Sequence, residues 1–246
     1  MPKTWIEYIA YGEVEIPLRI YLERRRSIRV AMGQDAVLLR MPAWLSQRSQ
    51  QVEIRKAKQW ALQTFDSKPA LLARYDRRSY QDGDHITVRG QDWRVSIVQK
   101  DRRTGSGKVT MTGHLHLQLP LDVLPIERDD MIRKLISRTL AAYYKPEIAR
   151  RVQKLNQLHF QEEIKDVYLK YNRSNWGSCS TNKNINLSTR LLLVPDEVLD
   201  YVIIHELAHL KEMNHSKKFW AWVEQADPDW REHTAWLEEQ GSLCEF

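Results

Sequence analysis

The stretch Tyr201-Val-Ile-Ile-His205-Glu206-Leu-Ala-His209-Leu-Lys-Glu-Met-Asn-His215 decides how the second half of the chain is organised. His205 and His209 are four residues apart, so on a helix they project from one face and both imidazoles can bind one metal ion. Glu206 lies about 100° further round the helix, close enough to act on a metal-bound water without being a ligand. The spacing therefore predicts a metal site with a general base beside it.

A third protein ligand would leave one tetrahedral position of zinc for water, as in catalytic zinc sites. His215 is the candidate if the helix ends first, and Asn214 is a residue type that can end a helix in the left-handed conformation. Ser216 can then cap a helix over residues 217–226. His233, in the last expected helix, is a weaker candidate. The plainer alternative is an amphipathic helix with two solvent-exposed histidines, which does not account for the placed third histidine.

The composition is that of a globular protein. The chain has 246 residues, 42% of them apolar, and nine tryptophans, which is enough for a packed core in one large or two small domains. It contains no apolar run long enough to span a membrane, and its first residues lack the apolar core of a signal peptide. The two cysteines, Cys179 and Cys244, give no disulfide framework, so we expect a cytoplasmic protein with no membrane partner.

The formal net charge is +6, from 38 basic and 32 acidic residues, and arginines cluster at 24–26, 77–78, 102–103 and 150–151. Such clusters can bind phosphates through salt-dependent attraction, which leaves a nucleic-acid partner open. Solvated turns and helix faces are the plainer explanation. Charge alone does not establish a nucleic-acid partner.

Hydrophobic patterning predicts an α+β fold with a β-rich N-terminal region, residues 1–120, followed by a second domain, residues 121–246. In the first region an antiparallel meander, a helix and a second group of strands are expected over 5–41, 47–65 and 85–119. In the second, helix is expected from 127, with Pro146 ending or kinking it, then strands at 167–171, 176–180 and 184–193 and a helix over 196–213. No internal repeat is apparent.

A resemblance to a known family is carried by His205-Glu206-Leu-Ala-His209 together with Arg173-Ser-Asn-Trp176-Gly177-Ser178-Cys179-Ser180, Ile185-Asn-Leu187, Arg190-Leu191, Asp200-Tyr201-Val202 and Asn214-His215-Ser216-x-x-Phe219-Trp220. These runs resemble the YgjP-like metallopeptidase family and, more distantly, the WLM and SprT-like zinc proteases. The resemblance is dense in the second half and loose in the first. It implies a zincin-like metallohydrolase domain whose active-site helix lies beside a small antiparallel sheet, where an edge strand near Trp176 pairs with extended substrate backbone.

We therefore expect a zinc-dependent metallohydrolase, in which His205, His209 and His215 hold one Zn²⁺ and Glu206 activates its bound water to cleave peptide bonds. Arg173 and Trp176 are the candidate substrate-binding residues, although a solvated turn and core packing are plainer roles for them. Gly177 is expected to allow a close approach of backbone.

Two other functions fit the same residues. The activated water would also hydrolyse a phosphoanhydride of a nucleoside triphosphate, with Arg173 binding phosphate. A nucleic-acid-binding module with structural zinc is the non-enzymatic alternative, and it needs four protein ligands. Cys179 could be the fourth, although a buried and inert thiol is the plainer interpretation.

Overall fold

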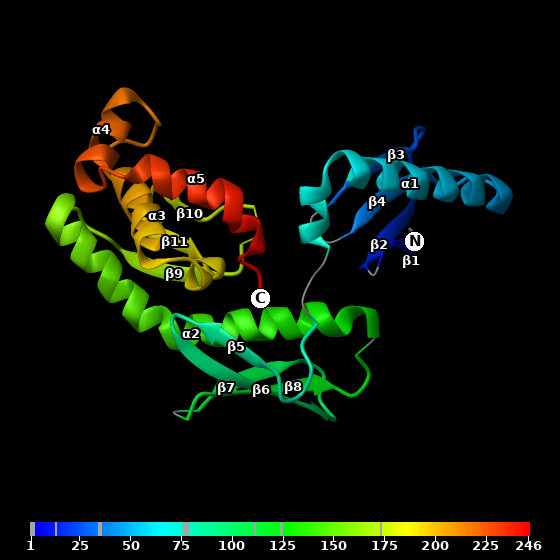
Figure 1. Ribbon diagram of the computed structural model, residues 1–246, viewed down its shortest axis with the longest axis horizontal. Coiled ribbons are helices and arrows are strands. Elements are labelled where there is room, and N and C mark those ends of the chain that lie inside the picture. Colours follow the sequence, from blue (N-terminus) through cyan, green and yellow to red (C-terminus); the bar gives the residue numbers. More distant parts are fainter. Residues whose placement is uncertain are drawn as a thin grey trace. The chain divides into compact units, whose positions relative to one another are not determined.

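The computed structural model describes residues 3–12, 14–33, 36–75, 79–110, 112–123, 125–172 and 174–246 (Figure 1). The chain divides into two compact units, Met1–Arg78 and Ser79–Phe246, which we describe separately. In both units a run of strands is followed by helices, which confirms the predicted α+β class with a β-rich N-terminal region.

The first unit is a four-stranded sheet with one long helix on it. Its elements are β1 (Lys3–Tyr11), β2 (Val14–Glu23), β3 (Arg29–Met32), β4 (Val37–Pro42), α1 (Gln47–Ser67) and the 3₁₀ helix η1 (Pro69–Arg74). Ser46 caps α1 by accepting a hydrogen bond from the backbone N–H of Ser49 at 3.2 Å. Residues at helical spacing bury one face of α1 on alternating residues of the sheet: Ile54, Ala57, Ala61 and Phe65 with Ile16, Leu18, Ile20 and Leu39.

The strand order of this sheet is β1-β2-β4-β3, and β2 and β4 run parallel. The predicted antiparallel meander is therefore wrong. After β2 the chain passes over the position beside it, forms β3 at the edge, and returns to fill that position with β4. Hydrophobic alternation fixes which face of a strand is buried, but it does not fix the order of the strands.

The second unit begins with the same arrangement. It consists of β5 (His85–Val88), β6 (Gln91–Lys100), β7 (Ser106–Val109), β8 (His114–Pro120) and α2 (Pro125–His159), with strand order β5-β6-β8-β7 and β6 parallel to β8. The registers also match, because Leu39 pairs with Ile20 and Val30 as Leu117 pairs with Ile97 and Gly107. The chain thus contains two copies of a ββββα fold, a repeat that sequence inspection missed.

Helix α2 ties the second sheet to the rest of its unit. Pro146 lies inside this single helix, whose direction changes along its length in Figure 1. Its residues belong to one continuous core with Val95 and Leu117 of the sheet and Leu199 and Ile203 further along the chain. The compact units therefore separate after Arg78, whereas the sequence placed the boundary between residues 120 and 121.

The remainder of the second unit is a small sheet with helices beside it. Its elements are β9 (Asp166–Lys170), β10 (Gly177–Cys179), β11 (Asn184–Ser188), η2 (Thr189–Leu193), α3 (Asp196–Ala208), α4 (Lys217–Ala226), α5 (Trp230–Gln240) and η3 (Gly241–Leu243). The strand order is β10-β11-β9, with an antiparallel pair β10–β11 and a parallel pair β11–β9. The strand expected to reach residue 193 ends at Ser188, whose hydroxyl accepts a hydrogen bond from the Arg190 N–H and starts η2.

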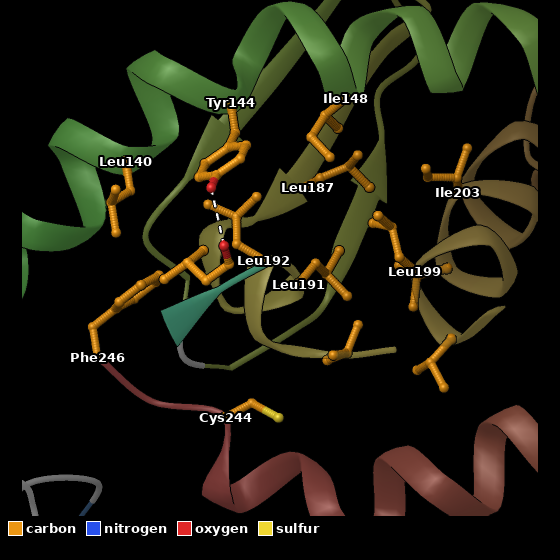
Figure 2. Close-up of a cluster of buried hydrophobic side chains, with 14 of the residues drawn as sticks. Leu140, Tyr144, Ile148, Leu187, Leu191, Leu192, Leu199, Ile203, Cys244 and Phe246 are labelled. Atoms are coloured by element: carbon orange, nitrogen blue, oxygen red, sulfur yellow. Dashed lines mark hydrogen bonds between the residues drawn. The ribbon is translucent and has the colours of Figure 1, made fainter. Parts of the chain in front are cut away.

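Helix α3 is fixed in place by apolar packing. Figure 2 shows side chains of α2, β11, η2 and α3 pointing toward one another, among them Tyr144, Leu187, Leu191 and Ile203. The Tyr144 hydroxyl donates a hydrogen bond to the carbonyl oxygen of Val88 at 3.0 Å. Burial of each large apolar side chain contributes about 1.5–3 kcal/mol, so this layer holds α3 firmly.

An ionic network fixes the N-terminal turn of α3. Arg151 of α2 donates to the carboxylates of Asp196 and Asp200, and Arg89 donates to Asp196 and Glu147 at 2.8 Å. Burial raises the pKa of the Asp196 carboxyl, but hydrogen bonds from Arg151 and the nearby Arg89 charge lower it by more, so its pKa lies below the usual value.

Candidate metal centre

Helix α3, which carries His205 and ends just before His209, is buried along most of its length. Asp196 and Glu197 occupy its first turn, where carboxylates interact favourably with the helix dipole. It ends at Ala208, five residues before the predicted end. The N–H groups of Leu210 and Lys211 bond to carbonyl groups only three residues back, so the α-helix gives way to tighter turns.

Because α3 ends at Ala208, the chain can turn and bring His215 back beside this helix. Asn214 is not among the described residues with positive φ, so the predicted left-handed helix end does not occur there. Ser216 caps α4 as predicted, with its hydroxyl accepting from the Phe219 N–H at 3.4 Å. The ring of Phe219 then packs against all three imidazoles, at centroid distances of 4.9 Å from His205, 4.5 Å from His209 and 4.7 Å from His215.

His205, His209 and His215 converge on one point. One ring nitrogen of each lies within 4.8 Å of the others, and the Nε2 atoms of His205 and His215 are 3.2 Å apart. His205 and His209 are partly buried, and His215 is exposed. The structure thus brings the three predicted ligands together, while the Nδ1 atom of the rival His233 lies 2.8 Å from a carboxylate oxygen of Asp227.

The surroundings favour the neutral form of His205 and His209. Burial, followed by the nearby His209 and His215, lowers the pKa of His205 to about 4, and burial also lowers the pKa of His209. The Nδ1 atom of His209 lies 3.3 Å from the carbonyl oxygen of Glu212, so a proton on Nδ1 leaves the lone pair on Nε2 for a metal.

The donor set fits a divalent transition metal. Neutral imidazoles are ligands that zinc, copper, iron and nickel accept, and three of them leave at least one coordination position for a reactant. The 3.2 Å approach of two ring nitrogens brings two lone-pair positions together, which a shared cation stabilises. The residues present therefore form a site that fits the metal of a metallopeptidase.

Glu206 lies beside this cluster on the wall of a pocket. Its side chain is 5% exposed, and burial raises its pKa to about 8 against the opposing effect of a hydrogen bond with the Cys179 backbone. Gly177 of β10 touches it so closely that a Cβ atom there would lie 2.6 Å from Glu206 Oε1. The predicted close approach at Gly177 is confirmed, and its partner is the candidate general base.

The pocket has a volume of about 500 Å³ and opens beside His205 and Glu206. Its walls come from the segment before β10 and from α3 and α5: Asn175, Trp176, Gly177, Tyr201, Val202, Thr234, Leu237 and Glu238. Trp176 is thus placed on the pocket wall. It also packs under the guanidinium of Arg190, 4.0 Å from the ring centroid.

Arg190 belongs to one of the runs that carry the family resemblance, but its structural role at the site was not predicted. Its side chain is 7% exposed and donates to the carbonyl oxygens of Cys244 and Gly241. It thereby holds the chain after α5 against Trp176. The residues of α5 that line the pocket were missed as well, because nothing in their local sequence signals proximity to a site 30 residues earlier.

The other candidates lie elsewhere. Arg173 falls outside the described residues. Cys179 is half-buried and is not part of the histidine cluster, and burial followed by the charge of Glu206 raises its pKa to about 11. His114 and His116 stack on the second sheet, and within the described residues they do not belong to a group of three metal-binding side chains. In the same residues, no helix combines the length and apolar composition needed to cross a bilayer.

Two solved structures are similar to part of this chain. The metallopeptidase zymogen of Pyrococcus abyssi abylysin is 24% identical over a match that covers 38% of this chain and 95% of that protein, with a TM-score of 0.34. The metallopeptidase zymogen of Methanocaldococcus jannaschii jannalysin is 26% identical over 36% of this chain and 92% of that protein, with a TM-score of 0.31. A search among curated proteins finds no match.

Residues 26–240 match the YgjP-like metallopeptidase domain, a span that includes the histidine cluster, Glu206, the whole second sheet, and strands β3 and β4 of the first sheet. The resemblance predicted from the sequence is confirmed, and the chain belongs to the YgjP-like family of metallopeptidase domains.

Proposed function

We propose that this chain is a zinc-dependent metallopeptidase in which His205, His209 and His215 hold the ion and Glu206 is the general base. The observation that supports this most strongly is the convergence of three imidazoles within 4.8 Å beside a buried carboxylate. Three protein ligands are typical of catalytic zinc. Zinc bound there would supply a Lewis acid that polarises a substrate carbonyl and favours deprotonation of water.

Glu206 would take a proton from the attacking water and pass it to the nitrogen of the leaving amine. Two features of the surroundings of Glu206 favour this role. Gly177 leaves the Glu206 carboxylate no room to move toward β10. Its Oε2 atom has no hydrogen-bond partner among the described residues, so this atom can accept a proton once the carboxyl is ionised, the form that a cation held by the three histidines would favour.

Substrate would bind as an extended peptide along β10, the outermost strand of its sheet and a neighbour of α3. The side-chain amide of Asn175 donates to the carbonyl oxygen of Gly177 at 3.0 Å, and a substrate N–H would take over this acceptor. Trp176, Val202 and Leu237 give the adjoining pocket an apolar wall suited to a substrate side chain.

The described residues favour peptide over phosphate. No described residue that lines the pocket is a lysine or arginine, whereas a nucleoside triphosphate needs cations. Arg173, the expected phosphate ligand, lies outside the described residues. The structural-metal alternative needs a fourth protein ligand, and the cluster formed by described residues has three. Free thiols at Cys179 and Cys244 suit a reducing cytoplasm.

The decisive experiment compares zinc-loaded protein with its Glu206→Gln variant on a peptide library and on nucleoside triphosphates. Loss of the base should lower kcat by about 10²–10⁴-fold while the metal content stays at one ion per chain. Glu238→Gln is the matched control, because it makes the same change at another carboxylate of the pocket, and it should keep kcat within a few fold. Full activity of Glu206→Gln, or cleavage of triphosphates alone, would refute the proposal.

A further inference from the structure

The repeated fold provides an internal comparison between the two sheets. Because their registers match, each residue of the first sheet has a counterpart in the second. On the sheet face away from α1, four residues of the first copy and their counterparts are Arg19, Tyr21, Arg29 and Arg40 against Ser96, Val98, Ser106 and Gln118. The four counterparts in the second sheet are uncharged, and the guanidinium of Arg102, which follows β6, donates to Ser106 and Gln118 at 2.6 Å. The fold therefore does not require arginine at these strand positions.

Aromatic side chains accompany these arginines. Tyr8 pairs with Pro17 on the same face and is 44% exposed. The guanidinium of Arg40 lies over the Tyr21 ring, 4.7 Å from its centroid. Trp44 lies two residues after the end of β4 and is 74% exposed, whereas its counterpart in the second copy is Asp122. We call Tyr8, Arg19, Tyr21, Arg29 and Arg40, with Trp44, the outer face.

The charge of the chain is divided unevenly. Residues 1–78 contain 15 basic and 8 acidic residues, which gives a net charge of +7. Residues 79–156 contain 14 basic and 9 acidic residues, a net charge of +5, and residues 157–246 contain 9 basic and 15 acidic residues, a net charge of −6. Two carboxylates of β2 lie on the same sheet face as the arginines of the outer face: Glu15, which is exposed, and Glu23, which binds Arg40 at 2.6 Å. No carboxylate of the described residues pairs with Arg24, which follows β2, or with Arg29. The first copy thus presents a cationic surface with exposed aromatic rings.

We propose that the outer face binds single-stranded nucleic acid. Arginines contact phosphate oxygens, and exposed aromatic rings stack on unpaired bases, which is how sheet surfaces bind single strands without sequence preference. The rows from Pro17 to Glu23 span about 20 Å along β2, enough for a short run of nucleotides. A membrane surface is less well matched, because the apolar side of α1 is buried on the sheet. Among the described residues of the strands and their connections, the exposed large apolar side chains are Tyr8, Ile28 and Trp44.

The test uses the full chain and fluorescein-labelled oligo(dT)20 and oligo(U)20, with binding followed by anisotropy between 50 and 200 mM salt. About four phosphate contacts give a slope of log K against log salt near −2.8, which is roughly a 50-fold loss of affinity over that range. Arg19→Ser, Arg29→Ser and Arg40→Gln together install the residues of the second sheet. In this variant the slope should become less steep by about 2, and the affinity at 0.1 M salt should fall by about 100-fold.

The matched control removes the same number of charges from the α1 side, with Arg48→Ala, Arg55→Ala and Lys68→Ala. It should retain most of the affinity. Trp44→Ala should weaken binding about tenfold, and Trp44→Phe should restore most of it because stacking needs only a ring. Equal losses in the two triple variants, no binding of either oligonucleotide at 50 mM salt, or binding only to phosphatidylserine vesicles would overturn the proposal. Preference for the DNA or the RNA strand would identify which nucleic acid the face takes.

Discussion

Gly177→Ala tests whether the position of Glu206 controls the reaction. The new Cβ atom would lie 2.6 Å from Oε1, 2.7 Å from Cγ and 2.8 Å from Cδ of Glu206, whereas ordinary contacts begin at 3.4 Å. The carboxylate must therefore move by about 0.8 Å or β10 must shift away from α3. A displacement of this size at a reacting group costs about 100-fold in rate, and the overpacking costs about 1–3 kcal/mol of stability.

We expect kcat of Gly177→Ala on a peptide substrate to fall about 100-fold, with metal affinity unchanged in a chelator competition. The double variant with Glu206→Gln should be no slower than Glu206→Gln alone, because both act on one carboxylate. Gly105→Ala is the steric control, since its Cβ would lie 2.9 Å from the flexible end of Leu135. Multiplying losses in the double variant, or wild-type kcat in Gly177→Ala, would refute the reasoning.

Three further predictions concern stability. Chelation should abolish turnover while circular dichroism shows an intact fold, because α3 is held by a large apolar core, and unfolding on chelation would contradict this. Arg190→Ala should lower the free energy of unfolding by about 3 kcal/mol in urea titrations, because two buried carbonyl groups lose their hydrogen-bond donor. Arg190→Lys should recover little of this stability, since lysine lacks the planar guanidinium, and full recovery with lysine would contradict the prediction. Asp196→Asn should destabilise by up to about 1 kcal/mol at pH 7. Because the folded pKa of Asp196 is lowered, its contribution is present above about pH 4, the range of the unfolded pKa, and is lost as the pH falls through the lowered folded value. The variant and the wild type should therefore have equal stability below that folded pKa, and a constant difference would count against it.

Local patterns identified the core of the candidate site from sequence alone. The spacing that places His205 and His209 together and the cap at Ser216 depend on neighbouring residues, and both were found where predicted, whereas the turn between them starts five residues earlier than expected. Residues that act across the fold were not identified. Arg190 and Leu237 reach the site only because α5 and the segment after it pack beside α3, and their sequence neighbours carry no sign of that contact.

The repeat illustrates the same limit. Its two copies share alternation and register but few identical side chains, so the likeness is visible only after the strands are paired. The division into two units after Arg78 likewise depends on which hydrophobic core α2 joins. Amphipathic spacing shows that a helix has an apolar face, but it does not identify the residues that this face packs against.

The sequence by itself determined the α+β class, the family and the three histidines with their glutamate, because short-range spacing on a helix fixes which side chains share a face. Only the tertiary structure decided the strand orders, the early end of α3, the contact between Gly177 and Glu206, and the pocket wall contributed by α5. These features depend on which surfaces pack together over long separations in the chain, and that choice is made by the whole core rather than by any one segment.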